Sequence, residues 1–390
     1  MKRHFRDAKI IQNAVLAGLV GLLFLTGCNR NDPETDALDA VTLSVNAGES
    51  LARTAPPASP EDKPFAGGLG EAIELLDSGR ADAAALALET LSLSETDNPP
   101  VFHHLSRAYV ALARGMAETA GRKGVLRQAR AASDRATALA PRDSSFWVQR
   151  AIVATLDRRP AHALDYIDKA RDLAPRDPEI AFAAATIYQS FGHSLEALMA
   201  YRFAVEQAPD NPEYLLGLGW YYSVAAEPDY EMAMTYFHQA ARICRRSEPI
   251  NSATLARASN NLGGVLKLLG RSDEALAAFS EAISSQPQSP LYWMNRSRLR
   301  LQTRQFPVYS PSDALTDALQ AVRLTQGRDP AALAVLSRAY YENRDFDSAI
   351  SRLRQANQIE STETYRRLLR AFERAAAENQ PNNDADEIVP

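Results

Sequence analysis

Small and apolar residues recur with a helical period through most of the chain, and proline interrupts that period at regular intervals. Three prolines close similar phrases: Leu-Ala-Pro-Arg-Asp at 139–143, the same five residues at 173–177, and Gln-Ala-Pro-Asp at 207–210. These prolines are 34 residues apart, and an Ala precedes each of them by twelve and by five residues. Small residues seven apart lie on one helix face, so a second helix can approach closely there.

Each interval is therefore interpreted as two helices joined by a turn. Pro cannot continue a helix, and the Asp or Asn that follows it starts a turn and caps the next helix. A fixed period of this length indicates a repeat, so the pattern predicts stacked helical hairpins. The body of the chain is rich in Ala and poor in Val and Ile, which also favours helix over strand.

The pattern resembles the tetratricopeptide repeat (TPR) family, which has an aromatic residue or Leu at position 4, Leu at 7, Gly at 8, Tyr at 11, Ala at 20, an aromatic at 24, Ala at 27 and Pro at 32. One unit, which begins near Ala256, matches over its whole length with Leu262, Gly263, Gly270, Ala275, Phe279, Ala282 and Pro287. The resemblance implies an all-α, right-handed superhelical solenoid of about eight hairpins.

The same pattern predicts how the rest of the chain is divided. We expect the TPR array over 65–362, a capping helix over 363–379 that is polar enough to cover the last apolar edge, and a disordered tail over 380–390. The second unit carries an insertion at 115–124, because its second-helix Ala129 comes eleven residues late. Such an insertion must lengthen the hairpin or its loop.

The amino terminus differs from the repeats. Lys2, Arg3, Arg6 and Lys9 precede an apolar run of twelve residues, 14–25, which is short for a membrane span but suits a signal peptide. The run ends in Leu25-Thr26-Gly27-Cys28, which resembles a bacterial lipobox. We therefore expect a lipoprotein signal peptide over 1–27, a lipid on Cys28 and a flexible tether over 28–64, which has no sustained apolar period. The alternative is an ordinary membrane anchor or a cleaved signal.

If the lipobox is used, Asn29 stands where an Asp would indicate retention in the inner membrane of a Gram-negative cell. The expected location is therefore the outer membrane, facing the periplasm. The membrane would be contacted through the Cys28 lipid alone. Cys244 is the second and last cysteine, so no disulfide is expected in the mature chain.

No catalytic spacing stands out. The sequence has no Gly-rich phosphate loop, no paired-Cys motif and no His-Glu-x-x-His. His103 and His104 are adjacent, so on a helix they point about 100° apart and do not form a metal-binding pair. The net charge of −5 gives no basic excess that suggests nucleic acid. We expect a protein that is not an enzyme and uses no cofactor or metal; the alternative is a periplasmic enzyme or a small-ligand or glycan binder.

The resemblance also implies where a partner binds. In TPR proteins the first helices line a concave groove. The residues that we expect to bind a partner there are Phe182, Trp220, Arg257, Asn260, Lys267, Arg298 and Arg338, with Asn295 beside them. The late, basic part resembles a carboxylate clamp, although Gly264 stands where the clamp has Asn. It predicts a protein or peptide partner with an acidic or carboxyl-terminal segment. The alternative is a solvated charged face. The expected function is a lipid-anchored scaffold or assembly factor of the cell envelope.

Overall fold

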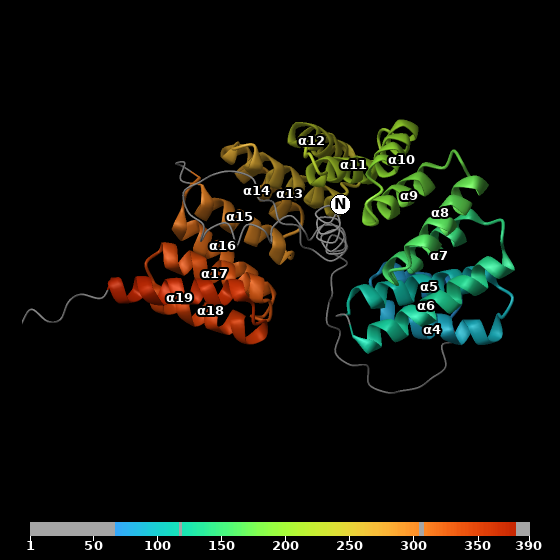
Figure 1. Cartoon of the computed structure of the whole chain (residues 1–390), viewed down its shortest axis with the longest axis horizontal. Helices are drawn as coiled ribbons and strands as arrows, with labels where there is room; N and C mark the ends of the chain where they lie inside the picture. Colours follow the sequence, from blue (N-terminus) through green and yellow to red (C-terminus); the bar gives the residue numbers. More distant parts are fainter. Residues whose placement is uncertain (1–66, 117–118, 304–307, 380–390) are drawn as a thin grey trace, which may run out of the picture. The chain divides into compact units, whose positions relative to one another are not determined.

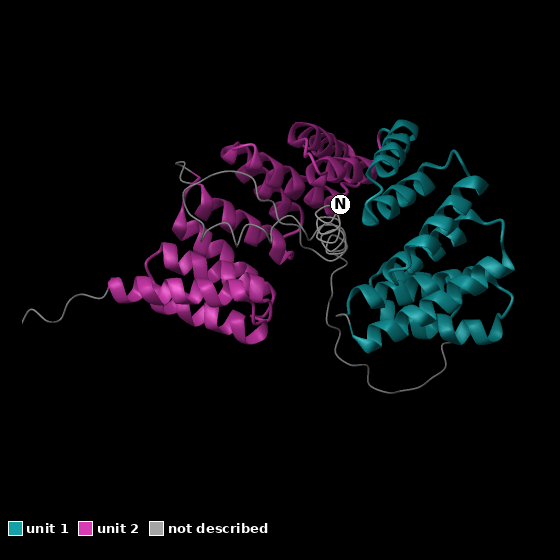
Figure 2. Ribbon diagram, viewed as in Figure 1, with its two compact units in different colours: residues 1–23, 44–209 teal, residues 24–43, 210–390 magenta. Residues whose placement is uncertain are grey.

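The computed structural model describes residues 67–116, 119–303 and 308–379, and every regular element in these ranges is an α-helix (Figure 1). The chain divides into two compact units, whose described parts are 67–209 and 210–379 (Figure 2). The predicted signal peptide, Cys28, the tether and the tail after residue 379 lie outside the described residues. In the described part, no helix is both long enough and apolar enough to cross a membrane.

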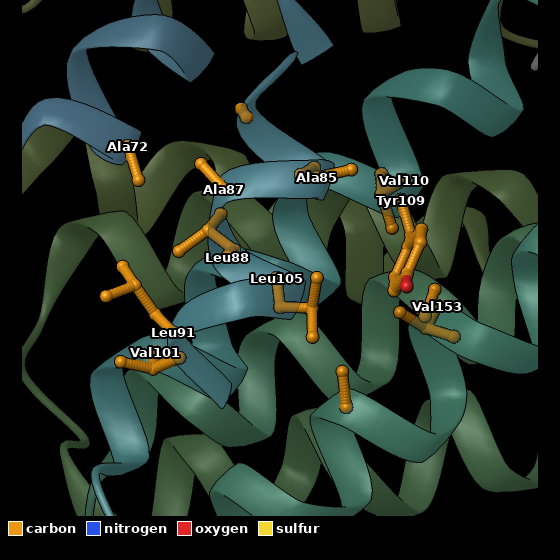
Figure 3. Packing of buried hydrophobic residues seen from close by; sticks show 14 residues of the cluster. Ala72, Ala85, Ala87, Leu88, Leu91, Val101, Leu105, Tyr109, Val110 and Val153 are labelled. Atoms are coloured by element: carbon orange, nitrogen blue, oxygen red, sulfur yellow. The ribbon is translucent and has the colours of Figure 1, made fainter. Parts of the chain in front are cut away.

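Unit 1 is a stack of four helical hairpins. The hairpins are α3 (Leu69–Asp77) with α4 (Ala81–Ser94), α5 (Pro99–Arg114) with α6 (Ala120–Leu139), α7 (Ser144–Leu156) with α8 (Pro160–Leu173), and α9 (Pro178–Ser190) with α10 (Ser194–Gln207). In its first hairpins, Ala72, Leu88, Leu105 and Val153 come from α3, α4, α5 and α7 and meet in one apolar cluster (Figure 3). The core is therefore shared between neighbouring hairpins, as a stacked repeat requires.

Unit 2 contains four more hairpins and a final helix. They are α11 (Pro212–Val224) with α12 (Tyr230–Arg246), α13 (Ser252–Leu268) with α14 (Ser272–Ser285), α15 (Pro290–Gln302) with α16 (Pro311–Leu324), α17 (Pro330–Glu342) with α18 (Phe346–Ile359), and α19 (Glu363–Glu378). The last helix covers α18 with Tyr365, Leu368 and Phe372 and turns its arginines to solvent. The ring of Phe372 also stacks on Tyr341 of α17, 4.2 Å between centroids.

The Pro-Asp phrases end one hairpin and begin the next. Asp143 and Asp177 each accept a hydrogen bond from the backbone N–H two residues later, at 2.9 Å, which caps α7 and α9. Two tryptophans reinforce the same junction. The indole N–H of Trp147 donates to the carbonyl oxygen of Pro141, and that of Trp293 to Pro287, both at 2.9 Å. The two bonds link the start of one hairpin to the turn that precedes it.

Glycine at position 8 allows the two helices of a hairpin to touch. A Cβ added at Gly263 would lie 2.8 Å from the ring of Phe279, and one added at Gly219 would lie 2.8 Å from the ring of Phe237. Both rings are buried, at 2% and 1% exposed. The Gly and the aromatic residue sixteen to eighteen positions later therefore form one close contact, which a side chain at the Gly would prevent.

Part of the insertion in the second hairpin, residues 120–124, belongs to its second helix. The second helix α6 has 20 residues, whereas α8, α10 and α14 have 14 each. The hydroxyl of Thr119 caps its amino terminus by accepting from the Arg122 N–H at 3.4 Å. In the seventh hairpin, residues 304–307 lie outside the described ranges, and Val308 beyond them is buried.

A buried ion network joins the helices of the seventh hairpin. The Asp317 carboxylate on α16 is 1% exposed. It accepts from Arg296 at 2.9 and 2.7 Å and from Arg300 at 2.6 Å, both on α15. The two guanidinium groups give a buried carboxylate the hydrogen bonds that burial requires.

Candidate functional site

Successive first helices touch one another within each unit. In unit 1, α3 contacts α5, α5 contacts α7, and α7 contacts α9; in unit 2, α11 contacts α13, α13 contacts α15, and α15 contacts α17. The side chains that these helices turn away from their second helices therefore share one surface in each unit. We call these the first-helix surfaces of unit 1 and unit 2.

The two predicted aromatic anchors belong to different units. Phe182 lies on α9 of unit 1, is half-buried, and meets the edge of the Tyr201 ring on α10 at 5.7 Å between centroids. Its ring thus contributes to packing inside its own hairpin. Trp220 lies on α11 of unit 2 and is half-buried too, directly after the Gly219 that contacts Phe237. Of the two, Trp220 shares a unit with the predicted basic residues.

Arg257 already has an acidic partner. Its guanidinium forms an ion pair with Glu213 of α11, and the side chains are 36% and 42% exposed. The same carboxylate accepts a hydrogen bond from the Thr254 hydroxyl at 2.8 Å. The pair links α11 to α13 across the first-helix surface of unit 2, so Arg257 adds little net positive charge to it.

Three of the predicted groove residues are buried, which corrects the expectation that they line an open groove. Asn260, Asn295 and Arg298 are 4%, 4% and 7% exposed. The Asn295 amide donates to the Asn260 amide oxygen at 2.8 Å, and Arg298 donates to the Asn295 amide oxygen at 3.4 Å. The polar chain therefore lies between α13 and α15, where adjacent first helices touch. The two hydrogen bonds within this chain help to offset the cost of burying its polar groups.

Lys267 and Arg338 are half-buried and each has an intramolecular contact. Lys267 donates to the Gln302 side chain at 3.2 Å. Arg338 pairs with Glu342 one turn later at 2.7 Å, and its guanidinium lies 5.6 Å from the centre of the Tyr341 ring. The first-helix surface of unit 2 is therefore mixed in charge, because Glu342, like Glu213, stands beside a predicted cation.

Both acidic partners could have been found from the sequence. Counting from Pro212 and Pro330, Glu213 stands at position 2 and Glu342 at position 13 of their repeats. Both are positions that the TPR register assigns to the groove. With Glu213 and Glu342 included, the first-helix surface of unit 2 is less positive than its basic residues alone would make it.

Two titratable side chains, His103 and Cys244, are held in their neutral forms. Burial, with help from His104 and Arg107, lowers the pKa of His103 to about 4, and Asp143 opposes that shift. Burial, followed by the charge of Glu213, raises the pKa of the Cys244 thiol. That thiol is fully buried and protonated at neutral pH, as expected for a packing residue. Within the described ranges, no three or more His, Cys, Asp or Glu side chains are grouped to hold a metal ion.

Comparisons with known proteins place this fold. Residues 256–289 match the family model described as tetratricopeptide repeat. Among solved structures, the chain is similar to PilW, a type IV pilus biogenesis factor, with 18% identity, a TM-score of 0.50, and coverage of 58% of this chain and 98% of that one. It is also similar to Cut9-Hcn1 of the APC/C, with 15% identity and a TM-score of 0.51. That match covers 77% of this chain and 54%, about half, of the other.

A third similar structure is a tetratricopeptide repeat protein from Parabacteroides merdae, with 15% identity, a TM-score of 0.44, and coverage of 69% and 98%. A search of curated proteins found no match. Three observations indicate the same repeat of helical hairpins: the 34-residue period, the contacts between Gly and an aromatic ring, and the matched unit at 256–289. The described chain is an all-α repeat solenoid, and residues 256–289 match a tetratricopeptide repeat.

Proposed function

We propose that this protein is a lipid-anchored scaffold or assembly factor of the bacterial cell envelope, which binds protein partners on the first-helix surface of unit 2. The resemblance of Leu25-Thr26-Gly27-Cys28 to a lipobox supports the anchor. Asn29, which stands where an Asp would indicate inner-membrane retention, supports the location at the outer membrane, facing the periplasm. The repeat fold supports the binding role, because stacked hairpins form extended surfaces for partners.

One observation carries the choice of surface. Trp220, Arg257, Lys267 and Arg338 are all half-buried and lie on α11, α13 and α17, which belong to the run of first helices in contact. A half-buried tryptophan can supply the apolar burial that dominates binding energy, and the charged residues around it can supply specificity. Carboxylates of an acidic or carboxyl-terminal segment of a partner would replace Glu213 and Glu342 as the ion-pair partners of Arg257 and Arg338. That exchange favours selectivity over raw affinity, since it replaces existing pairs.

The test is site-specific photo-crosslinking in intact envelopes. A crosslinking amino acid at Lys267 should capture a discrete set of proteins. The matched control is Asp273, which is exposed at the start of α14, a second helix. We expect the control to capture none of that set. Identical products from both positions would place the partner elsewhere and contradict the proposal.

The anchor is tested separately by mass spectrometry of the mature amino terminus. We expect a polypeptide that begins at Cys28 and carries acyl groups. At least two acyl chains are expected, because one alone gives only marginal membrane binding. A mature chain that begins at any other residue would refute the lipid anchor. That result would not bear on the proposed binding surface of unit 2.

A further inference from the structure

Charge is unevenly distributed along unit 1. Residues 114–159 contain ten Lys or Arg and four Asp or Glu, a net of +6. The flanking segments are acidic: 67–113 contain two basic and seven acidic residues, and 160–209 contain four and seven. The whole-chain charge of −5 hides this basic segment, which spans α6, α7 and the turn that leads to α8.

Three of these basic side chains lie on one face of α6, the longest of the described helices. Lys123, Arg127 and Arg130 are spaced i, i+4 and i+7 on α6, so they form one stripe along it. Lys123 and Arg127 are exposed, and neither has an ion pair or side-chain hydrogen bond in the described part of the chain. The extra turns that the insertion adds to α6 carry Lys123, so the insertion lengthens this stripe.

The stripe leads into a polar cleft between α6, α7 and α8. The polar residues that line it are Arg130, Asp134, Arg150, Asp157, Arg159 and Tyr166. Two of the arginines are paired: Arg150 with Asp134 at 2.8 Å and Arg130 with Asp157 at 3.7 Å. Arg159 has no such partner within the described ranges. Cations therefore outnumber carboxylates in the cleft, and unpaired Lys123 and Arg127 lie beside it.

We propose that the α6 stripe and this cleft form a second binding surface, for an acidic segment of a partner protein. A partner helix with Glu at i and i+4 would present two acidic side chains whose Cβ atoms lie about 5–6 Å apart, the same i, i+4 spacing as Lys123 and Arg127. A further acidic side chain would enter the cleft and meet Arg159. Arg is suited to this role because its guanidinium binds a carboxylate in a bidentate manner.

The cleft favours a protein over an anionic lipid surface. Arg150 is recessed, at 22% side-chain exposure, and Asp134 and Asp157 line the same cleft. A flat layer of headgroups cannot reach a recessed guanidinium and would be repelled by the two carboxylates. A protein side chain can enter the cleft, and its neighbouring N–H groups can donate to the aspartates. Such charge patterning mainly sets specificity and association rate.

The experiment measures binding of a labelled acidic helical peptide, with Glu at every i and i+4 position, to the full chain in neutral detergent. The Gln version of the peptide is the negative probe. Fluorescence anisotropy should show binding of the Glu peptide that weakens steeply between about 0.05 and 0.5 M salt, as exposed charges become screened. The double variant Lys123→Glu, Arg127→Glu should raise its Kd roughly tenfold or more. Because both side chains are exposed and unpaired, the helical content of the variant should not change.

The matched control reverses two cations at the same i, i+4 spacing elsewhere. Arg366→Glu with Arg370→Glu lies on the exposed face of α19 in unit 2 and should leave the Kd within about twofold. Arg159→Gln should weaken binding, because it removes the unpaired cation of the cleft. Equal loss in the α6 and α19 double variants would show a response to net charge alone and overturn the proposal.

Two further outcomes also decide the matter. If Lys267→Glu abolishes peptide binding and the α6 double variant does not, the acidic probe binds the first-helix surface of unit 2. That result supports the proposed function and overturns the second surface. If micelles doped with phosphatidylglycerol displace the peptide, and those doped with phosphatidylcholine do not, the surface belongs to anionic headgroups. The assignment to a protein partner would then be wrong.

Discussion

The contact between Gly263 and Phe279 gives the sharpest test of the repeat packing. Gly263→Ala adds a single methyl group in the middle of α13. On an isolated helix this change stabilises by about 1 kcal/mol, because Ala is the better helix former. In this protein the new Cβ would lie 2.8 Å from two ring carbons and 3.0 Å from a third, closer than carbon atoms normally approach. The ring is 2% exposed, so it cannot move aside into solvent.

The two effects oppose each other, and their magnitudes decide the sign. Overpacking a well-filled contact costs about 1–3 kcal/mol. Restoring an ordinary contact of roughly 3.4 Å or more requires a shift of several tenths of an ångström by a buried aromatic ring or by the helix itself, which places the cost in the upper part of that range. Subtracting the helix gain leaves a net destabilisation of about 1–2 kcal/mol.

The assay is urea unfolding followed by circular dichroism, with a matched control. Gly124 lies within α6, and a Cβ added there would meet nothing within 4 Å. Gly124→Ala should therefore stabilise by about 0.5–1 kcal/mol, the opposite sign for the same chemical change. Phe279→Leu should relieve the effect of Gly263→Ala in a double-mutant cycle, because the two residues are in contact. If Gly263→Ala stabilises as much as Gly124→Ala, the close approach of α13 and α14 is wrong.

Three further changes test other parts of the structure. Ala204→Leu should destabilise by about 1–3 kcal/mol, because Ala204 is fully buried on α10, whereas exposed Glu227→Ala should stay within about 0.5 kcal/mol; similar melting temperatures would contradict the packing. Because the folded pKa of His103 is about 4, below the ordinary 6.5, the unfolded chain binds its proton first, so stability should fall by at most about 3 kcal/mol from pH 6.5 to 4. In the His103→Gln variant, the urea midpoint should depend less on pH between 4 and 6.5. A pH dependence identical to that of the wild type would refute the lowered pKa of His103. Asp317→Asn should cost about 3–5 kcal/mol in urea unfolding, because the guanidinium groups of Arg296 and Arg300 lose their buried counter-charge; a loss below about 1 kcal/mol would contradict that network.

The fold was predictable because its determinants are local and periodic. The Ala-Pro phrases repeat every 34 residues, and the helix ends coincide with them: α8 ends at Leu173 and α9 begins at Pro178. The all-α repeat solenoid follows from that period and is confirmed. Where the period broke, at 115–124, the sequence could not say whether a loop or a helix absorbed the extra residues. The choice depended on how α6 packs against α5 and α7.

The candidate site was less predictable, because the repeat register assigns a residue to one face of a helix but does not determine how deeply its side chain is buried. Asn260 and Arg298 were assigned to the correct helices, yet their burial depends on how closely α13 and α15 approach. The register places Glu213 and Arg257 on the same surface, but it does not show that these side chains, 44 residues apart, form an ion pair. The basic stripe on α6 was not predicted for a related reason: the net charge of the whole chain averages out charge that is concentrated in one segment.

The position-4 tryptophans have a practical consequence beyond packing. The chain has three tryptophans, and Trp147 lies in unit 1, whereas Trp220 and Trp293 lie in unit 2. Because the Trp147 and Trp293 indoles are fixed by hydrogen bonds to proline carbonyls, their emission should change when the hairpin junctions open. A Trp147→Phe variant would leave an optical signal from unit 2 alone, and a variant without the other two would report on unit 1. Whether the two units unfold together or separately can then be read, without an added label, by comparing the two unfolding curves.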